Sequence, residues 1–185
     1  TRLCHASSVV ALLENIGSGA VTASFAECRN AEAIIVIGAN PTVNHPVAAT
    51  FIKNAAQRGA RLYILDPRGQ HLDRYATESL RFSPGSDVAM LNAMINVIIT
   101  EELYDADYVA KQTEGFEDLK ARTAHTTPEA MAPICGVDAD TLRRVARGYA
   151  TAGSAMIFWG MGISQHTHGT DNSRCLISLS LLTGN

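Results

Sequence analysis

Near the start of the chain a thiol stands beside an imidazole, at Cys4 and His5, with the hydroxyls of Ser7 and Ser8 close behind. A neighbouring histidine can lower the pKa of a cysteine, and the resulting thiolate binds a soft metal or attacks a substrate. However, an isolated cysteine is usually a small buried apolar residue, and neighbours on a strand point to opposite faces. Spacing alone therefore favours an inert Cys4, and any other role needs support from the rest of the chain.

Four polar or glycine-rich segments each follow an apolar run: 38–41 (GANP), 66–68 (DPR), 84–87 (PGSD) and 160–165 (GMGISQ). If the four runs are parallel strands, these segments share one edge of the sheet, and in open α/β sheets that carboxyl edge binds nucleotides. Glycines let a backbone approach a ligand, and helix starts at Pro46 and Ser86 offer free amides to an anion. Arg68 offers a bidentate fork for phosphate. A nucleotide-like ligand is predicted at this edge.

Asp66 allows two interpretations. Its carboxylate can hold a ribose hydroxyl or accept two hydrogen bonds from the donor edge of a guanine. Alternatively it forms a turn before Pro67, a common role for this residue type. Segment 38–40 lacks the second glycine of a G-x-G-x-x-G motif, and no Walker A sequence occurs. An ordinary Rossmann NAD site is therefore disfavoured.

The elements that must position these residues follow from apolar periodicity and capping signals. Strands are expected at 33–37, 61–65, 80–82 and 154–159, and helices at about 8–15, 46–58, 86–102, 105–111, 116–124, 127–134, 138–152 and 171–182. Ser7 or Ser8 is expected to cap the first helix, and Ser86 or Asp87 the long one. Residues 33–65 have the length of one right-handed βαβ unit. We expect one α/β domain over 1–185, three-layered and Rossmann-like, with a mainly parallel sheet flanked by helices.

Composition excludes several classes of protein. A hydrophobic fraction of 46% with 18% charged residues is typical of a globular protein, and a net charge of -3 gives no electrostatic case for nucleic acid or an acidic membrane surface. No apolar run approaches the roughly 20 residues of a membrane span. The four cysteines are far apart, which disfavours a disulfide framework or a structural zinc site and favours a reducing, cytoplasmic compartment. His166, His168 and Asp171 are loosely spaced, so a polar surface loop is favoured over a metal cluster.

Cys4 and His5, together with these loops, resemble the molybdenum or tungsten bis(pyranopterin guanine dinucleotide) oxidoreductases. Within that family the sequence is most similar to the catalytic subunit of formate dehydrogenases, especially the soluble NAD-linked type. Each matching segment alone is shared with nitrate reductases and other relatives, whereas the combination is specific. The segments are LCHASSV at 3–9, IGANP at 37–41, NHP at 44–46, DPR at 66–68, PGSD at 84–87, LNAM at 91–94, TEGF at 113–116, WGMG at 159–162 and LTGN at 182–185.

The resemblance implies a role for each matching residue. Cys4 is implied as the thiolate ligand of the metal, and His5 as the neighbour that assists proton or hydride movement in formate oxidation. His5 also favours formate dehydrogenase over nitrate reductase. The implied cofactor is a molybdenum (or tungsten) bis-molybdopterin guanine dinucleotide, with electrons leaving through iron–sulfur clusters towards NAD. The residues implied to bind the cofactor are Gly38, Asn40, Pro41, Asn44, Asp66, Pro67, Arg68, Gly85, Ser86, Asp87, Gly160, Met161, Gly162 and Gln165.

By the same resemblance, the iron–sulfur cysteines, a second cofactor-binding domain and an active-site arginine lie outside residues 1–185. The chain is then one domain of a longer subunit, inactive alone, whose implied partners are the rest of that subunit and electron-transfer subunits, with no nucleic acid and no membrane. Two alternatives stay open. One is a nitrate reductase or another oxidoreductase of the same family, and the other is a nucleotide-binding module without chemistry in which Cys4 is ordinary.

Overall fold

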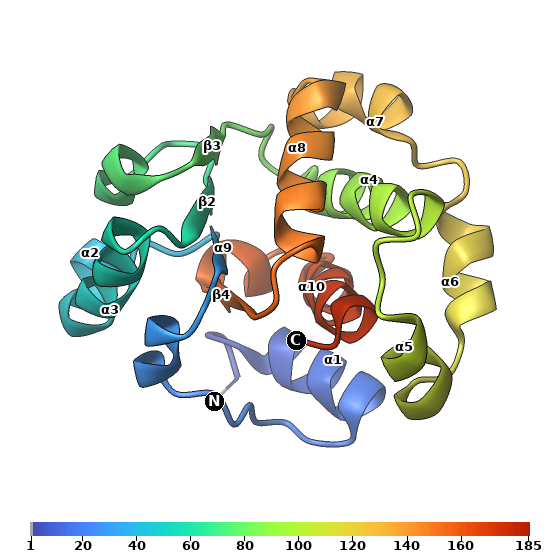
Figure 1. The fold of residues 1–185 in the computed structure, drawn as a ribbon, viewed down its shortest axis with the longest axis horizontal. Helices are drawn as coiled ribbons and strands as arrows, with labels where there is room; N and C mark the ends of the chain where they lie inside the picture. The colour runs from blue at the N-terminus through green and yellow to red at the C-terminus, as the bar shows by residue number, and fades with distance from the viewer. Residues whose placement is uncertain (1) are drawn as a thin grey trace.

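A parallel sheet of four strands forms the centre of the molecule, with helices on both of its faces (Figure 1). The computed structural model of the chain describes residues 2–185. The strand order is β3-β2-β1-β4, with β1 at Ala33–Ile37, β2 at Arg61–Leu65, β3 at Glu78–Leu80 and β4 at Ala155–Trp159. The expected α/β class with a parallel sheet is confirmed.

Strand β1 lies inside the sheet, and all five of its residues are buried. Its continuous β-branched run is typical of a parallel strand that is covered on both faces. The register pairs its last residue, Ile37, with Leu65 of β2 and with Trp159 of β4, and it pairs Leu65 with Leu80 of β3. Because the four strands end level with one another, the four loops that follow them emerge along one edge.

Alternate residues of β1 enter two separate hydrophobic cores. Ile35 and Ile37 pack in the larger core, beneath α4 (Asp87–Thr100), α8 (Ala139–Ala150) and α10 (Gly169–Thr183). Ile34 and Val36 pack in the smaller core on the other face. That core is covered by α3 (Pro46–Gln57) and by two 3-10 helices, η1 (Phe25–Arg29) and η2 (His71–Tyr75).

Three helices connect α4 to α8: α5 (Ala106–Gln112), α6 (Phe116–Thr123) and α7 (Pro128–Cys135). Their starts follow the expected capping signals. Asp105 accepts a hydrogen bond from the Tyr108 amide at 2.9 Å, and Thr127 accepts one from the Ala130 amide at 3.3 Å. Asp138 caps α8 through the Thr141 amide at 2.8 Å. None of the helices formed by residues 2–185 is long and apolar enough to cross a membrane.

Helix α1 (Ala6–Ile16) packs beside α10 (Figure 1). The prediction that Ser7 or Ser8 caps this helix is wrong. The helix begins at Ala6, so both serines lie inside its first turn, and the N-cap residue His5 makes no side-chain cap bond. Ser7 Oγ instead donates to the Ser164 carbonyl at 2.7 Å. Ser8 Oγ accepts from Trp159 Nε1 at 2.9 Å and lies 3.2 Å from Ser173 Oγ. The Ser8 hydroxyl therefore joins α1 to β4 and α10, and the Ser7 hydroxyl joins it to the segment that follows β4.

Two further expectations differ from the structure. The third strand ends at Leu80 instead of Phe82, because the Asp66 amide donates the last ladder bond to the Leu80 carbonyl at 3.1 Å. Phe82 is buried in the larger core as a loop residue. Neither expected cap of the long helix operates: Ser86 Oγ donates to the Ser83 carbonyl at 2.6 Å, and Asp87 is the first residue of α4.

Candidate functional site

The loops after β1 and β4 contact each other through their backbones at the carboxyl edge of the sheet. The Gly162 amide donates to the Gly38 carbonyl at 2.9 Å. Gly38 has a φ of +56°, and a Cβ on Gly162 would lie 2.7 Å from both Gly38 Cα and Gly38 O. A Cβ on Gly160 would lie 2.9 Å from the same carbonyl. Only glycine permits this approach. The next strand in the chain, β2, pairs with one side of β1, whereas β4, which follows β3 in the chain, pairs with the other side. The junction is thus the switch point where α/β sheets bind ligands.

Asp66, at the end of β2, forms the turn that its place before Pro67 indicates. Its Oδ1 accepts from the amides of Arg68 at 2.8 Å and Gly69 at 3.1 Å. The residue is 7% exposed, and within residues 2–185 nothing donates to its Oδ2. The turn presents the exposed Arg68 at the edge. Asp66 therefore forms the turn with Oδ1 and leaves Oδ2 available to a donor on a ligand. Its hydrogen bond to a ribose hydroxyl or to guanine stays a prediction.

Two side chains that sequence reasoning missed hold this turn in place. Arg81 donates to the Asp66 carbonyl at 3.2 Å and to Asp73 Oδ2 at 2.5 Å. Gln70 Nε2 donates to the Ala39 carbonyl at 2.8 Å and so connects the loops after β2 and β1. Burial raises the pKa of Asp73, but the Gln70 amide and the Arg81 guanidinium together hold it below its usual value. No local pattern predicts the bonds to the Asp66 and Ala39 carbonyls, because these partners lie in other segments of the chain.

Asn40 presents an amide at the middle of the edge. Its Oδ1 accepts from Thr42 Oγ1 at 2.7 Å, and among residues 2–185 nothing accepts from its Nδ2. The side chain is partly buried at the start of the short helix α2 (Pro41–Asn44). Pro41 is buried and Asn44 is exposed. The open donor at Asn40 suits an oxyanion or a carbonyl.

Asp87 carries a buried oxygen without a partner. The residue is 1% exposed, and no group in residues 2–185 donates to its Oδ2. Burial raises the pKa of this carboxyl, and positive charge on His166 or His168 would lower it. His168 Nε2 is also buried without a partner in the described residues. Buried polar atoms in native proteins are almost always hydrogen-bonded, so this part of the edge needs polar groups in addition to those of residues 2–185.

No role for His168 was predicted, because a polar surface loop was expected at this position. Its ring lies 5.6 Å from that of His166, while Asp171 is bonded to Arg174 at 2.7 Å. Residues 2–185 contain no group of three or more His, Cys, Asp or Glu side chains that could hold a metal ion. The chain therefore offers individual ligands at this edge and no complete metal site of its own.

The loop after β4 also fixes the segment that carries Cys4. Ser164 Oγ donates to the Cys4 carbonyl at 2.5 Å, and Gln165 Nε2 donates to the Leu3 carbonyl at 3.1 Å. Ser164 belongs to the short helix α9 (Met161–Ser164), which directly follows β4. Cys4 and His5 are exposed. The fold thus places the thiol and the imidazole at the same edge as the other candidate residues.

The other three thiols are buried away from solvent. Burial raises the pKa of Cys28 to about 11 and that of Cys175 to about 12. Cys28 and Cys175 therefore stay protonated at neutral pH, which disfavours either sulfur as a nucleophile. Exposure therefore separates Cys4 from the rest, a distinction that spacing in the sequence could not make.

The candidate residues form a row along the edge, in the order of the strands. Asp66 and Arg68 follow β2, Asn40 follows β1, and Met161 and Gln165 follow β4 beside Cys4. Because neighbouring strands lie about 4.8 Å apart, the row from β2 to β4 extends about 10 Å. Such a row suits an elongated ligand with several polar groups rather than a compact one.

The family model for molybdopterin oxidoreductases matches residues 1–185. The chain belongs to the molybdopterin oxidoreductase family. Among curated relatives it is 42% identical over 184 residues to formate dehydrogenase H of Escherichia coli, and 40% identical over 184 residues to the F420-dependent formate dehydrogenase subunit alpha of Methanocaldococcus jannaschii. It is 34% identical over 185 residues to the assimilatory nitrate reductase of Haloferax mediterranei. Each alignment covers the whole chain, which spans 26%, 27% and 25% of these relatives respectively.

Among solved structures, acetylene hydratase from Pelobacter acetylenicus superposes on 97% of the chain with a TM-score of 0.85 and 31% identity, and the match covers 24% of that protein. The family implies a molybdenum or tungsten pterin cofactor, as the sequence resemblance predicted. Proteins named as formate dehydrogenases, a nitrate reductase and a hydratase all match this molybdopterin oxidoreductase chain. Family membership therefore gives the cofactor class, while the reaction has to be argued from the site.

Proposed function

We propose that this chain belongs to a formate dehydrogenase, in which it binds one nucleotide arm of a bis(molybdopterin guanine dinucleotide) cofactor and supplies Cys4 to the molybdenum or tungsten. The observation that carries the proposal is the exposed Cys4, held by Ser164 and Gln165 at the edge where the other candidate residues lie. Formate as the substrate is supported by the two relatives at 42% and 40% identity, both named formate dehydrogenases. The 34% identity to the nitrate reductase equals that to two further formate dehydrogenases, so this value does not separate the two activities.

The polar groups of the edge fit a guanosine diphosphate arm. Arg68 and the Asn40 amide are donors for its phosphate oxygens. Asp66 Oδ2 and the buried Asp87 Oδ2 are acceptors for hydroxyl or guanine N–H donors. The glycine junction of Gly38 and Gly162 leaves the loop backbone bare of side chains where the ligand would pass. When bound, the cofactor supplies a metal centre that accepts electrons from the substrate.

The residues beside the metal have complementary roles in this proposal. A thiolate is a soft donor and suits a metal already held by sulfur ligands. Oxidation of formate to carbon dioxide releases one proton and two electrons, and the exposed imidazole of His5 is the adjacent base that receives the proton. The electrons leave through iron–sulfur clusters towards NAD, in parts of the enzyme outside this chain. Free, unpaired cysteines at positions 4, 28, 135 and 175 suit a cytoplasmic setting.

Substitution of Cys4 in the full-length enzyme tests the proposal. Cys4→Ser should remove formate turnover, lower the metal content and remove one sulfur neighbour of the metal in X-ray absorption spectra. His5→Gln should lower turnover while the metal content stays at the wild-type value. Leu3→Ala, a neighbouring exposed position, serves as the control. Undiminished turnover in Cys4→Ser would refute the assignment of Cys4 as a ligand.

A substrate comparison separates formate dehydrogenase from the family alternatives. The same preparation should reduce an acceptor dye with formate and should fail to oxidise a reduced dye with nitrate. The reverse result would favour a nitrate reductase. Titration of guanosine diphosphate, with Asp66→Ala as the control, tests the nucleotide edge separately from the chemistry.

A further inference from the structure

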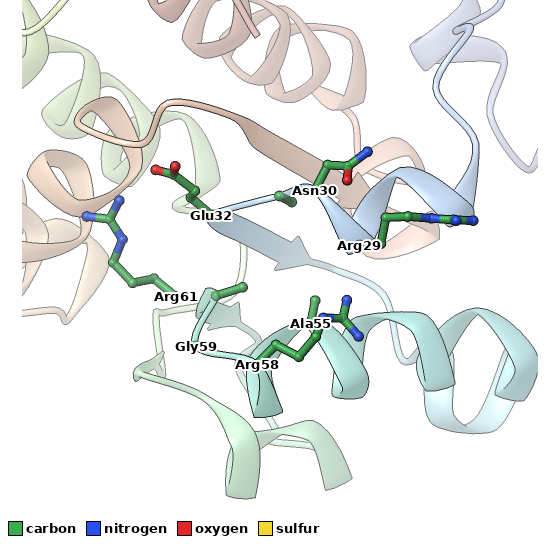
Figure 2. Close-up of a pocket in the computed structure, with 9 residues that line it drawn as sticks. Arg29, Asn30, Glu32, Ala55, Arg58, Gly59 and Arg61 are labelled. Atoms are coloured by element: carbon green, nitrogen blue, oxygen red, sulfur yellow. The ribbon is translucent and has the colours of Figure 1, made fainter.

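The amino edge of the sheet, opposite the candidate cofactor residues, contains a pocket of about 420 Å³ (Figure 2). The strands β1 and β2 begin beside it, and η1 and the end of α3 form its other walls. Three arginines and one glutamate lie among its nine lining residues, although the whole chain has a net charge of -3. The lining residues are Arg29, Asn30, Ala31, Glu32, Ala55, Arg58, Gly59, Ala60 and Arg61.

Two of the four charged side chains are already tied to the turn after α8. Glu32 Oε2 accepts from the Gly153 amide at 2.8 Å, and Arg61 Nη1 donates to Thr151 Oγ1 at 3.2 Å. Figure 2 shows Glu32 and Arg61 on the same side of the pocket. The negative charge of Glu32 disfavours an anion on this side and confines one to the other side.

Arg29 and Arg58 lie on that other side (Figure 2). Arg29 Nε donates to the Ala26 carbonyl at 3.0 Å, which fixes the stem of the side chain and leaves both Nη groups open. Arg58 follows the last turn of α3, and within residues 2–185 its guanidinium has no carboxylate within ion-pair distance. By contrast, Arg81, Arg143, Arg144, Arg147 and Arg174 all pair with carboxylates.

The shape and chemistry of the pocket define its ligand class. An arginine at a helix C-terminus interacts favourably with the helix dipole, and this interaction alone could explain the position of Arg58. It explains neither the pocket nor the presence of Arg29. Two guanidinium forks without a counterion match the oxygens of phosphate or carboxylate groups. The volume lies within the range of about 300–1,000 Å³ typical of small-molecule sites. No aromatic side chain lines the pocket, so it offers no platform for a nucleobase.

We propose that this pocket binds a small polyanion bearing phosphate or carboxylate groups between Arg29 and Arg58. The inference does not depend on the proposed redox function. The pocket lies at the opposite end of strands of five residues, roughly 16 Å from the carboxyl edge at 3.3 Å per residue.

Calorimetric titration of the full-length protein with pyrophosphate, at constant ionic strength, tests the proposal. Wild type should bind at micromolar to millimolar concentration, and Arg58→Gln or Arg29→Gln should weaken binding about tenfold or more, as expected when one charge-assisted bond is lost. Arg122→Gln removes an exposed cation at the end of α6 and should change nothing. A parallel titration with citrate distinguishes the two ligand classes. Stronger binding of citrate would indicate a carboxylate ligand, and stronger binding of pyrophosphate would indicate a phosphate ligand.

Three results would overturn the proposal: no binding of either anion, equal weakening by Arg122→Gln, or weakening by Arg68→Gln at the carboxyl edge without any effect of Arg58→Gln. Arg58→Lys keeps the charge but removes the bidentate guanidinium, so its affinity for the anion should lie between those of wild type and Arg58→Gln. Thermal unfolding of each variant identifies a fold defect. If Arg58→Gln is unfolded, the exposed Arg29→Gln decides the outcome.

Discussion

Two helices that begin at the carboxyl edge, α2 and α4, differ from α5, α7 and α8 in how their first turns are satisfied. Among the latter, Asp105, Thr127 and Asp138 each cap a helix with a side-chain oxygen. At the edge, α2 and α4 begin after Asn40 and Ser86, which are suitable capping residues, yet neither side chain caps its helix. Asn40 Oδ1 accepts from Thr42 Oγ1 instead, and Ser86 Oγ donates to the Ser83 carbonyl.

This difference concerns the backbone amides of the first helical turn. A capped first turn has one amide satisfied by its own side chain, whereas an uncapped turn leaves its amides to water or a ligand. Free amides at a helix start attract anions such as phosphates. The first turns of α2 and α4 therefore leave amides free beside the residues proposed to bind the cofactor, whereas α5, α7 and α8 each have one of these amides capped.

Thiol reactivity should show the largest contrast between the two regions. Cys4 is exposed at the edge, while Cys135 is buried among the capped helices. At pH 8 a pKa of about 11 leaves Cys28 about one part in a thousand ionised. One thiol per chain should react with an aromatic disulfide reagent at least about 100-fold faster than the others. Cys4→Ser should remove the fast phase, and a fast phase that survives this change would contradict the assignment.

Gly162→Ala should strongly destabilise the edge. The added Cβ would lie 2.7 Å from the Gly38 backbone, which cannot move without disturbing the end of β1. We expect the free energy of unfolding to fall by about 3 kcal/mol, measured by urea denaturation. In Gly153→Ala the new Cβ would meet only the flexible Glu32 carboxylate, at 3.3 Å, so its cost should stay below about 1 kcal/mol. If both variants lost the same free energy of unfolding, the close backbone contact between Gly162 and Gly38 would not explain the loss in Gly162→Ala.

Removal of a cap should have a smaller effect in the capped region. Asp105→Ala deletes the acceptor of the Tyr108 amide at the start of α5 and should lower the free energy of unfolding by about 1 kcal/mol. Asp105→Asn retains a capping oxygen and should cost only a few tenths of a kcal/mol. If both variants lose the same stability, the carboxylate charge rather than the cap is responsible.

The smallest expected effect is a pH dependence at Asp87. Its pKa is raised above the ordinary value of 3.8 by burial, so its contribution to stability is highest in acid and is lost as the pH rises through the folded pKa. Asp87→Asn should therefore gain stability relative to wild type at pH 7 and gain less at pH 4. Bonds from the Thr141 hydroxyl and amide lower the pKa of Asp138, so Asp138→Asn should behave in the opposite way, losing more at pH 7 than in acid. Chemical denaturation at the two pH values measures both.

Local signals in the sequence predicted much of the fold. The β-branched run of β1 and the strand β2 were predicted to the residue, and so were the caps at Asp105 and Asp138, because both depend on neighbours within a few positions. The parallel direction of the strands, which gathers four loops at one edge, was also predicted, whereas the strand order was not. The role of Ser8 was wrong, since its partners lie 151 and 165 residues away.

For the candidate site too, local signals in the sequence predicted some residues, while contacts between distant segments required the structure. Arg68 and Asn40 stand directly after strands, where the sequence indicated them. The anchoring bonds of Arg81 and Gln70, and the unpartnered His168 Nε2, depend on loops that meet only in the folded chain. Cys4 matched the family motif, but its placement beside Gln165 required the structure.

The bonds that hold the Cys4 segment also set when the site can form during synthesis. Cys4 is held by Ser164, 160 residues later in the chain. At translation rates of about 5–20 residues per second, that interval lasts on the order of 10 s. Throughout it, the thiol has no folded neighbour to orient it and is open to oxidation or to the wrong metal. A cofactor that binds the ordered Cys4 segment therefore has to be delivered after residues 164–173 have been synthesised.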